Sequence, residues 1–273
     1  MKKLLPIVSI AIVAVAALVV VQCDALLGGA PGNITITAAS DSTIQVSWTS
    51  PTEGTPDKYI IYFKAVDAGS YTQLDETTAT VYVHDPMGAT GTYKVEAQFG
   101  TDTYTGTTFP TSVPAENTAQ TISELNGAGN SGYGWDMTDG DAMTYSMTDA
   151  GSAPNVDLYF TDWATGYAGP QYSVASPDMA ESDPGNTGFV PSASWKVNGF
   201  SDPVADENGP LPRHQQTTYF NYTDVTQTPL IVGCYTEEGY YAMVKVNSVN
   251  TGSGEVELES WFQLIQGLRL VQH

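Results

Sequence analysis

The chain has 273 residues, of which 30 are acidic and nine are Lys or Arg, so its formal net charge at pH 7 is −21. Such an acidic surface repels nucleic acid and anionic lipid headgroups, and we therefore exclude nucleic acid as a partner. The length suffices for one large domain or for two ordinary domains, each with its own hydrophobic core.

The N-terminus has the layout of an export signal. Lys2 and Lys3 precede an uncharged run from Leu4 to Val21, and Gln22-Cys23-Asp24 follows. Val20-Val21-Gln22-Cys23 resembles the bacterial lipoprotein signal, which implies removal of residues 1–22, acylation of Cys23 and a lipid anchor in the cell envelope, periplasmic or at the cell surface. Two alternatives stay open. The apolar run would span about 27 Å as an uncleaved helical anchor, and ordinary secretion is the other.

Residues 31–108 show the period-two alternation of half-buried strands. The clearest runs are Thr43–Trp48, Lys58–Lys64 and Tyr93–Phe99, in each of which the apolar side chains share one face. Several short strands in so short a segment indicate a β-sandwich.

This segment resembles a fibronectin type III domain. The residues that carry the resemblance are Pro31 before the first strand, Trp48 on the second, the strand with Tyr59, Ile61 and Phe63, and Tyr93. The resemblance implies an immunoglobulin-like sandwich that acts as a spacer. It also implies that the Tyr93 hydroxyl ties the chain to an upstream backbone group. Pro86 lies seven residues before Tyr93, so the corner loop is expected to be longer than usual.

Residues 109–114 read Phe-Pro-Thr-Ser-Val-Pro and are predicted to be a semi-rigid linker. Residues 115–273 then form a second all-β, sandwich-like domain that is expected to bind a ligand. A hairpin is predicted at Glu237-Glu238-Gly239, and residues 164–212 are rich in Gly, Pro, Asp and Ser and are expected to form loops. The predicted strands are Tyr133–Met137, Val156–Phe160, Thr217–Tyr222, Leu230–Tyr235, Tyr240–Val249 and Glu255–Leu264.

Part of this second domain is similar to the all-β, haem-scavenging surface lipoproteins of Bacteroidetes-type bacteria. The similarity lies in residues 155–160, in the late hairpin through Tyr240–Val246 and in residues 252–262. We do not carry over the haem, because His84, His214 and His273 are the only histidines and none of them forms a pair at ligand spacing.

Two acidic loops are the candidates for cation binding. Asp136, Asp139 and Asp141 surround Gly140, and a second acidic loop runs from Asp202 to Gly209. Ca²⁺ prefers several oxygen ligands from a tight turn, so the first loop is a candidate calcium site. Neither loop has the EF-hand spacing, and solvated acidic turns are the alternative. No other cofactor is predicted.

Aromatic residues around the loop-rich stretch are the candidate ligand-binding residues: Trp163, Tyr167, Tyr172 and Trp195. Aromatic rings on loops can stack on sugars or anchor a protein partner. Alternatively, they fasten the long loops onto the sandwich. Cys234 lies in an apolar strand-like run and is expected to be a buried, unreactive thiol.

The sequence contains no Gly-x-Ser-x-Gly elbow, metalloprotease His pair or phosphate-binding glycine loop. We therefore expect a non-catalytic binding module for a glycan or a protein, carried on a fibronectin type III spacer and anchored to the membrane. An acidic glycan hydrolase and a purely structural cell-envelope protein are the alternatives.

Overall fold

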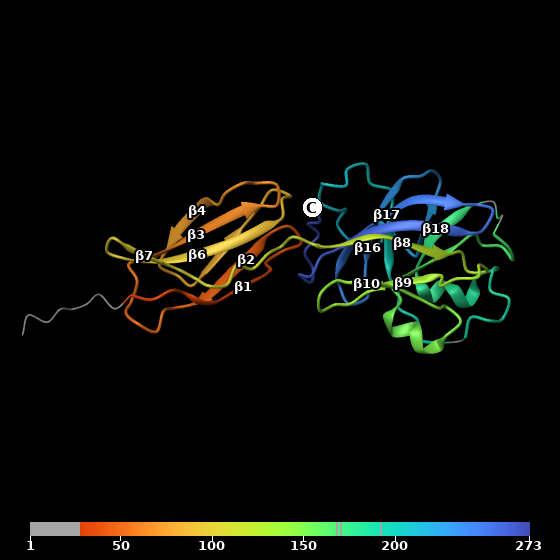
Figure 1. Ribbon diagram of the computed structural model, residues 1–273, viewed down its shortest axis with the longest axis horizontal. Coiled ribbons are helices and arrows are strands. Elements are labelled where there is room, and N and C mark those ends of the chain that lie inside the picture. Colours follow the sequence, from red (N-terminus) through yellow and green to blue (C-terminus); the bar gives the residue numbers. More distant parts are fainter. Residues whose placement is uncertain (1–27, 168, 170, 192) are drawn as a thin grey trace, which may run out of the picture.

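The computed structural model describes residues 28–167, 169, 171–191 and 193–273. The predicted signal, residues 1–22, and the predicted lipid site, Cys23, lie outside these residues. The described chain forms two β-rich units that follow each other along the long axis of the molecule (Figure 1). They are an N-terminal sandwich, residues 28–112, and a C-terminal sandwich, residues 115–264. The predicted all-β fold class is confirmed.

Seven strands build the N-terminal sandwich. They form one sheet in the order β1-β2-β5 and a second in the order β4-β3-β6-β7, and all neighbours are antiparallel. The strands are β1 (Gly32–Ala38), β2 (Ile44–Thr49), β3 (Lys58–Ala65), β4 (Thr72–Thr77), β5 (Val81–His84), β6 (Gly91–Phe99) and β7 (Asp102–Thr105).

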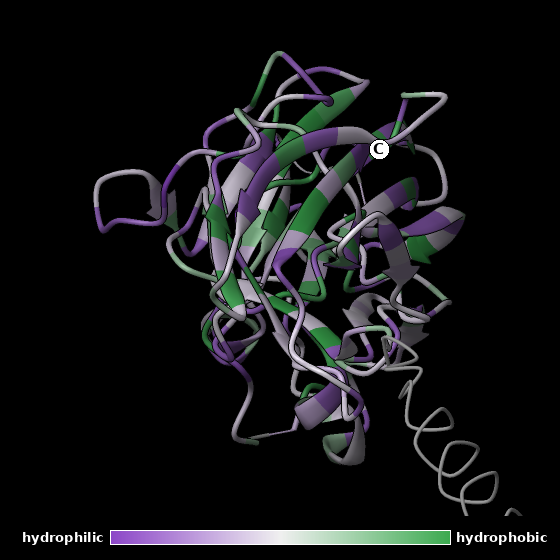
Figure 2. Ribbon diagram, turned by 90° about the vertical axis from the view of Figure 1, so that its left-hand side faces the viewer, coloured by the Kyte–Doolittle hydropathy of each residue, from purple (hydrophilic) through white to green (hydrophobic). Residues whose placement is uncertain are grey.

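The alternating sequence explains why these segments are strands. In β6 every second residue is buried, so Tyr93, Val95 and Ala97 enter the core while their neighbours face outward. The same alternation appears as hydrophobic and hydrophilic bands along several strands in Figure 2. Trp48 and Tyr59 close this core with an edge-on ring contact at a centroid distance of 5.3 Å.

The contact of Tyr93 differs from the expectation. Its hydroxyl lies 2.8 Å from Nδ1 of His84, a side chain at the end of β5, rather than bonding to an upstream backbone group. The segment between β5 and β6, residues 85–90, is long, and His84 is the polar group that reaches the hydroxyl. A histidine that looked isolated in the sequence therefore borders the core of the N-terminal sandwich, against the rings of Phe63 and Tyr93.

Two larger sheets face each other in the C-terminal sandwich. The five-stranded sheet has the order β10-β9-β11-β12-β15, and the six-stranded sheet has the order β14-β13-β16-β17-β18-β8. The strands are β8 (Ala115–Ser123), β9 (Gly132–Trp135), β10 (Ala142–Tyr145), β11 (Leu158–Thr161), β12 (Tyr172–Ala175), β13 (Gly199–Ser201), β14 (Tyr219–Phe220), β15 (Tyr222–Val225), β16 (Leu230–Tyr235), β17 (Tyr241–Asn250) and β18 (Glu255–Phe262).

The main core lies between these sheets and includes Phe160, Phe200, Val244 and Phe262. Strands β16 and β17 form the predicted hairpin, and Gly239 supplies the left-handed turn conformation with φ 88°. Cys234 of β16 is fully buried in this core, and burial raises the pKa of its thiol well above the ordinary value. The expectation of a buried thiol is confirmed.

The loop-rich stretch covers the outer face of the five-stranded sheet. Two short 3-10 helices also lie on this face. Helix η1 (Ala150–Asn155) precedes β11, and η2 (Pro177–Ser182) belongs to the loop-rich stretch. Tyr159 and Ala175 point away from the main core and pack with Trp195 in a second apolar cluster. The long loops are therefore packed against the sheet, and both faces of its central strands β9, β11 and β12 are buried.

The C-terminal tail joins the two sandwiches. After β18 the chain turns back, and Leu268 and Leu270 are buried in the core of the N-terminal sandwich. The predicted linker is also less separate than expected, because Tyr93 N donates to Pro110 O at 2.9 Å and Ser112 N to Gly91 O at 2.8 Å. The two units therefore share a packed junction.

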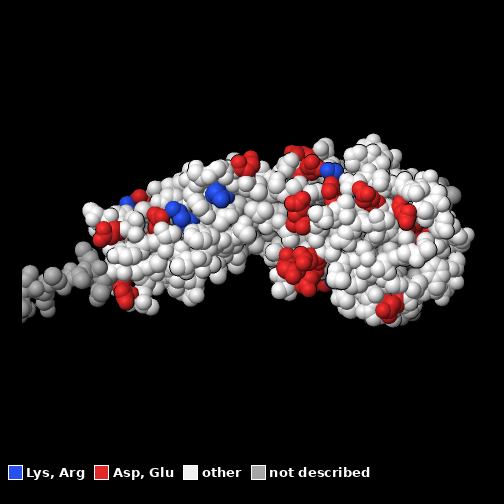
Figure 3. Space-filling view, viewed as in Figure 1, with Lys and Arg blue, Asp and Glu red and all other residues white. Residues whose placement is uncertain are grey.

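Among the described residues, no helix has the length and apolar character needed to cross a membrane. The face seen in Figure 3 carries many more Asp and Glu than Lys and Arg side chains, as expected from the composition.

Candidate functional site

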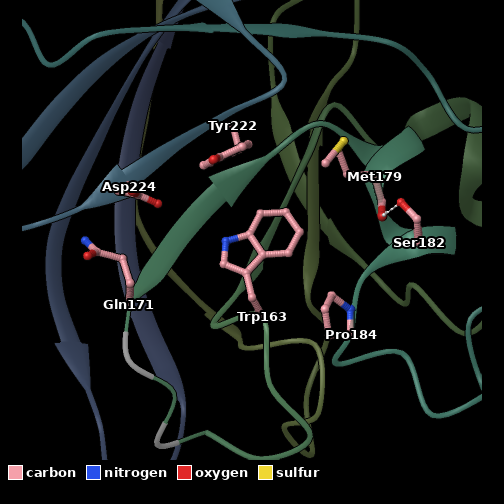
Figure 4. Close-up of a pocket in the computed structure, with 7 residues that line it drawn as sticks. All are labelled: Trp163, Gln171, Met179, Ser182, Pro184, Tyr222 and Asp224. Atoms are coloured by element: carbon pink, nitrogen blue, oxygen red, sulfur yellow. Dashed lines mark hydrogen bonds between the residues drawn. The ribbon is translucent and has the colours of Figure 1, made fainter.

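An open cleft of about 460 Å³ lies on the outer side of the five-stranded sheet, next to β12 and the edge strand β15. Side chains from the loop after β11, from β15 and from η2 with the turn that follows it surround the cleft (Figure 4). The lining residues are Trp163, Gln171, Met179, Ser182, Pro184, Tyr222 and Asp224.

Trp163 adopts a backbone conformation that side chains rarely take. Its φ is 57°, in the left-handed region, which costs a non-glycine residue roughly 1–3 kcal/mol. Two local hydrogen bonds hold this turn. Trp163 N donates to Thr161 Oγ1 at 3.0 Å, and Ala164 N donates to Asp162 Oδ1 at 2.9 Å. Non-glycine residues in this region cluster at functional sites, so the conformation of Trp163 is a hint of function.

A chain of hydrogen bonds orients the indole ring. Trp163 Nε1 donates to Ser173 Oγ at 2.8 Å, and Ser173 Oγ donates to Asp224 Oδ1 at 2.7 Å. Ser173 on β12 and Asp224 on β15 are direct cross-strand partners, so the sheet register places them side by side. In the described part of the chain, no group donates to Asp224 Oδ2, and this oxygen can accept a hydrogen bond from a ligand.

Tyr222 and Met179 complete an apolar floor beside Trp163. The Tyr222 ring meets the Trp163 ring edge-on, with centroids 5.3 Å apart and planes at 71°, and Tyr222 is 43% exposed. Asn221 Nδ2 lies 3.7 Å from the sulfur of Met179. The Gln171 amide, the Ser182 hydroxyl and the Asp224 carboxylate add polar groups around this floor.

None of the seven lining residues is Lys, Arg or His. The cleft therefore offers aromatic faces, hydrogen-bond donors and acceptors and one carboxylate, without a positive charge to bind an anion. Small-molecule sites are commonly built in this way, from an apolar floor with a few polar groups that orient the ligand.

The comparisons with known proteins concern the N-terminal sandwich. The family model for the fibronectin type III domain matches residues 29–118. Residues 29–118 therefore contain a fibronectin type III domain, as the sequence predicted. The last residues of this match, Ala115 to Thr118, belong to β8 and pair with β18 of the C-terminal sandwich.

Solved structures similar to the chain include fibronectin type III domains. An FN3 domain of human collagen XX has 20% identity, covers 31% of this chain and 91% of that chain, and has a TM-score of 0.27. The FN5 domain of Drosophila Lar has 15% identity, coverage of 31% and 95%, and a TM-score of 0.25. A two-domain segment of chicken tenascin has 9% identity, coverage of 85% and 97%, and a TM-score of 0.25. A search of curated proteins gives no match.

The predicted aromatic site is only partly assembled. Trp163 lines the cleft, but Tyr172 and Trp195 are 8% and 6% exposed and belong to the hydrophobic clusters of the C-terminal sandwich. Tyr172 faces the main core because period-two alternation turns it away from the side of Ser173. Tyr167 is exposed on the loop after Trp163, outside the cleft lining, and lies against Gly254. Tyr172 and Trp195 thus pack inside the C-terminal sandwich and its loops and do not line the cleft.

Two carboxylates of the candidate calcium loop accept hydrogen bonds within their own turn. Asp136 Oδ1 accepts a hydrogen bond from Thr138 N at 2.7 Å, and Asp139 Oδ1 accepts one from Asp141 N at 3.0 Å. Within the described ranges, no group of three or more His, Cys, Asp or Glu side chains is placed to hold a metal ion. Asp136 and Asp139 thus cap their own turn, as short acidic side chains often do.

Sequence reasoning missed most of the cleft. Gln171, Met179, Ser182, Pro184, Tyr222 and Asp224 were not predicted. The one available signal was the aromatic run Tyr219-Phe220-Asn221-Tyr222, which was assigned to a single strand. In the structure this run is split between β14 and β15, which belong to different sheets.

Buried carboxylates support the Trp163 loop. Glu124 accepts hydrogen bonds from Asn126, whose amide also donates to Ala164 O at 2.7 Å. Burial raises the pKa of Glu124 to about 7; the hydrogen bonds from Asn126 oppose this rise, while the nearby charges of Asp162 and Asp183 add to it. A carboxyl group that titrates near neutral pH therefore lies beneath the loop that carries Trp163.

Proposed function

We propose that this protein is an exported, lipid-anchored carbohydrate-binding protein. In this proposal a sugar ring lies in the cleft of Trp163 and Tyr222, and the fibronectin type III domain is a spacer. The observation that carries it is the hydrogen-bonded, partly exposed Trp163 ring beside the carboxylate of Asp224.

The chemistry of the cleft favours a sugar among possible ligands. The C–H groups of a pyranose can stack on aromatic rings, whereas its hydroxyls need donors and acceptors at the rim. Trp163 and Tyr222 provide the first, and Gln171, Ser182 and Asp224 provide the second. The acidic lining disfavours sugars that carry carboxylate or sulfate groups.

The order of the parts supports an anchored receptor. The described chain begins, in red, at the end of the N-terminal sandwich that faces away from the C-terminal sandwich (Figure 1). Helix η2 (teal in Figure 1), which supplies Met179 and Ser182, lies on the side of the C-terminal sandwich away from the fibronectin type III domain. A lipid on Cys23 would thus hold the cleft away from the membrane surface.

The test is a glycan array followed by calorimetric titration of the exported chain with each positive glycan. We expect Trp163→Ala to weaken binding at least about tenfold, which corresponds to ~1.4 kcal/mol. Tyr167→Ala is the matched control, because Tyr167 is an exposed aromatic on the same loop that does not line the cleft. Equal binding by wild type and Trp163→Ala would contradict the proposal.

The same samples separate binding from hydrolysis. We propose that the cleft binds without cleaving, so a glycan recovered after prolonged incubation should keep its original chain length. A hydrolase needs two carboxyl groups positioned about the scissile bond. Shortened products that disappear in Asp224→Asn would instead favour the acidic hydrolase.

A further inference from the structure

A second cleft lies on the other flank of β15. It has a volume of about 350 Å³. Its lining residues come from the segment after β13, from β14 and β15, and from Thr226, which follows β15. The lining residues are Asp202, Pro203, Phe220, Tyr222, Thr223, Asp224 and Thr226. Tyr222 and Asp224 also line the first cleft, so the two clefts adjoin each other at this strand.

The topology explains why β15 has one open edge, since its other edge pairs with β12. Strand β15 is the last strand of the five-stranded sheet, and β14 is the last strand of the six-stranded sheet. The chain passes from one sheet to the other at Asn221, between the two strands. A short edge strand therefore forms a ridge with a cleft on each side.

Three aromatic rings follow this surface from one cleft to the other. Trp163 belongs to the first cleft, Tyr222 to both and Phe220 to the second. Phe220 is 44% exposed and Tyr222 43%, which is unusual for rings placed next to a large core. A row of exposed rings fits a ligand made of repeated units, because each ring can contact one unit.

The charge of the combined surface restricts the ligand further. Asp202 and Asp224 are the charged residues among those that line the two clefts, and neither cleft is lined by Lys, Arg or His. The Thr226 hydroxyl adds a donor and acceptor. A neutral polymer avoids the repulsion that an acidic polymer would meet here.

Pairing of β15 with a strand from another protein is less compatible with the contacts. Thr223 Oγ1 donates to Ser201 O at 2.7 Å, which holds β13 against β15. Thr226 N donates to Asp224 O at 3.2 Å, so the backbone bends at the end of the strand instead of continuing straight. The edge is therefore short and partly covered, which natural proteins use to discourage strand addition.

We infer that the site binds an extended, neutral glycan chain that crosses β15, with one sugar unit on Trp163 and Tyr222 and a further unit on Phe220. This inference rests on the proposed function and adds the length and the charge class of the ligand. Asp224 lies between the two units and can accept hydrogen bonds from either.

The experiment is a titration, followed by tryptophan fluorescence, of the exported chain with neutral β-1,4-linked gluco-, xylo- and manno-oligosaccharides of increasing length. We expect one series to show at least tenfold tighter binding when the chain grows from one unit to four. Phe220→Ala should remove most of this gain and leave the affinity for the single unit unchanged. Met143→Ala is the matched control, since Met143 is 60% exposed on β10, the opposite edge of the same sheet.

The possible failures can be told apart. Affinity that does not depend on chain length, or a Phe220→Ala variant that matches wild type at every length, would overturn the chain-crossing inference alone. Equal binding of polygalacturonate, an acidic polymer, would overturn the neutral class. Absence of binding to every sugar, single units included, would instead contradict the proposed function.

Discussion

Arg269, in the C-terminal tail, holds Asp41 of the fibronectin type III domain through two hydrogen bonds. Arg269 Nε donates to Asp41 Oδ2 at 2.9 Å, and Arg269 N donates to Asp41 O at 2.9 Å. Arg213 of the C-terminal sandwich adds two more, from Nε and Nη2 to the same carboxylate. One acidic residue in the turn between β1 and β2 thus joins the two sandwiches.

We expect Asp41→Ala to destabilise this junction by about 1–3 kcal/mol, because it removes an acceptor from two guanidinium groups. Burial alone would raise the pKa of Asp41, but Arg213 and Arg269 bring it below the ordinary value of 3.8. The contribution to stability is therefore present above pH 3.8 and is lost as the pH falls through the lowered pKa. Calorimetric unfolding at pH 7 and pH 3 measures both effects. Asp67→Ala, an exposed carboxylate of the same domain, should leave unfolding unchanged.

Leu270→Ala should destabilise the fibronectin type III domain although the residue lies near the other end of the sequence. Leu270 is fully buried in the core of this domain, and such truncations cost about 2–5 kcal/mol. Leu264→Ala, at a 37% exposed position of the same segment, is the control. Urea unfolding followed by tryptophan fluorescence, to which Trp48 of this core contributes, checks the prediction. An equal loss of unfolding free energy in both variants would argue against a shared core.

The raised pKa of Glu124 predicts that the protein is less stable at pH 8 than at pH 5. Because its folded-state pKa is raised from 4.5 to about 7, the folded chain binds more protons than the unfolded chain between these values. The free energy of unfolding therefore falls as the pH rises through this window, by about 3 kcal/mol for this group at 1.36 kcal/mol per pKa unit. Glu124→Gln should flatten the slope, whereas Glu116→Gln, exposed on β8, should not. Urea unfolding across the pH range is the measurement.

Ser173→Ala should weaken sugar binding although Ser173 does not line the cleft. The change leaves Trp163 Nε1 without its acceptor and Asp224 Oδ1 without its donor, so the indole ring is no longer held in place. Asp224→Asn keeps an acceptor for Ser173 and should lower affinity with the Trp163 emission unchanged. A shifted emission in Ser173→Ala alone identifies Ser173 as a positioning residue. Identical emission in wild type and Ser173→Ala would contradict that role.

The proposed anchor predicts that cells expressing the protein incorporate labelled palmitate into it. Cys23→Ala should abolish the label and release the protein from the membrane fraction. Cys234→Ala keeps Cys23, and because Cys234 is fully buried, the label should persist in this variant. Label that survives Cys23→Ala would indicate another acylation site, whereas unlabelled Cys23→Ala protein that stays in the membrane fraction would favour an uncleaved anchor.

The local alternation of residues was enough to predict β2, β3 and β6 of the fibronectin type III domain and the hairpin of β16 and β17. In these segments one face is buried and the other meets water, so the pattern records the fold directly. In the C-terminal sandwich, β8, β10, β12, β13 and β15 were missed. In β12 all four residues are buried, because both faces of its sheet are covered, and no alternation results.

The cleft depended on tertiary structure. Trp163, Met179 and Tyr222 are far apart in the chain, and they meet only because the sheet order places β12 beside β15 and η2 covers the adjoining face. The junction between the two sandwiches also depends on tertiary structure, since the returning C-terminal tail brings Arg269 to Asp41. Local sequence encodes the direction in which a side chain leaves its strand. Strand order and loop packing set which distant side chains this side chain contacts. Both depend on interactions along the whole chain.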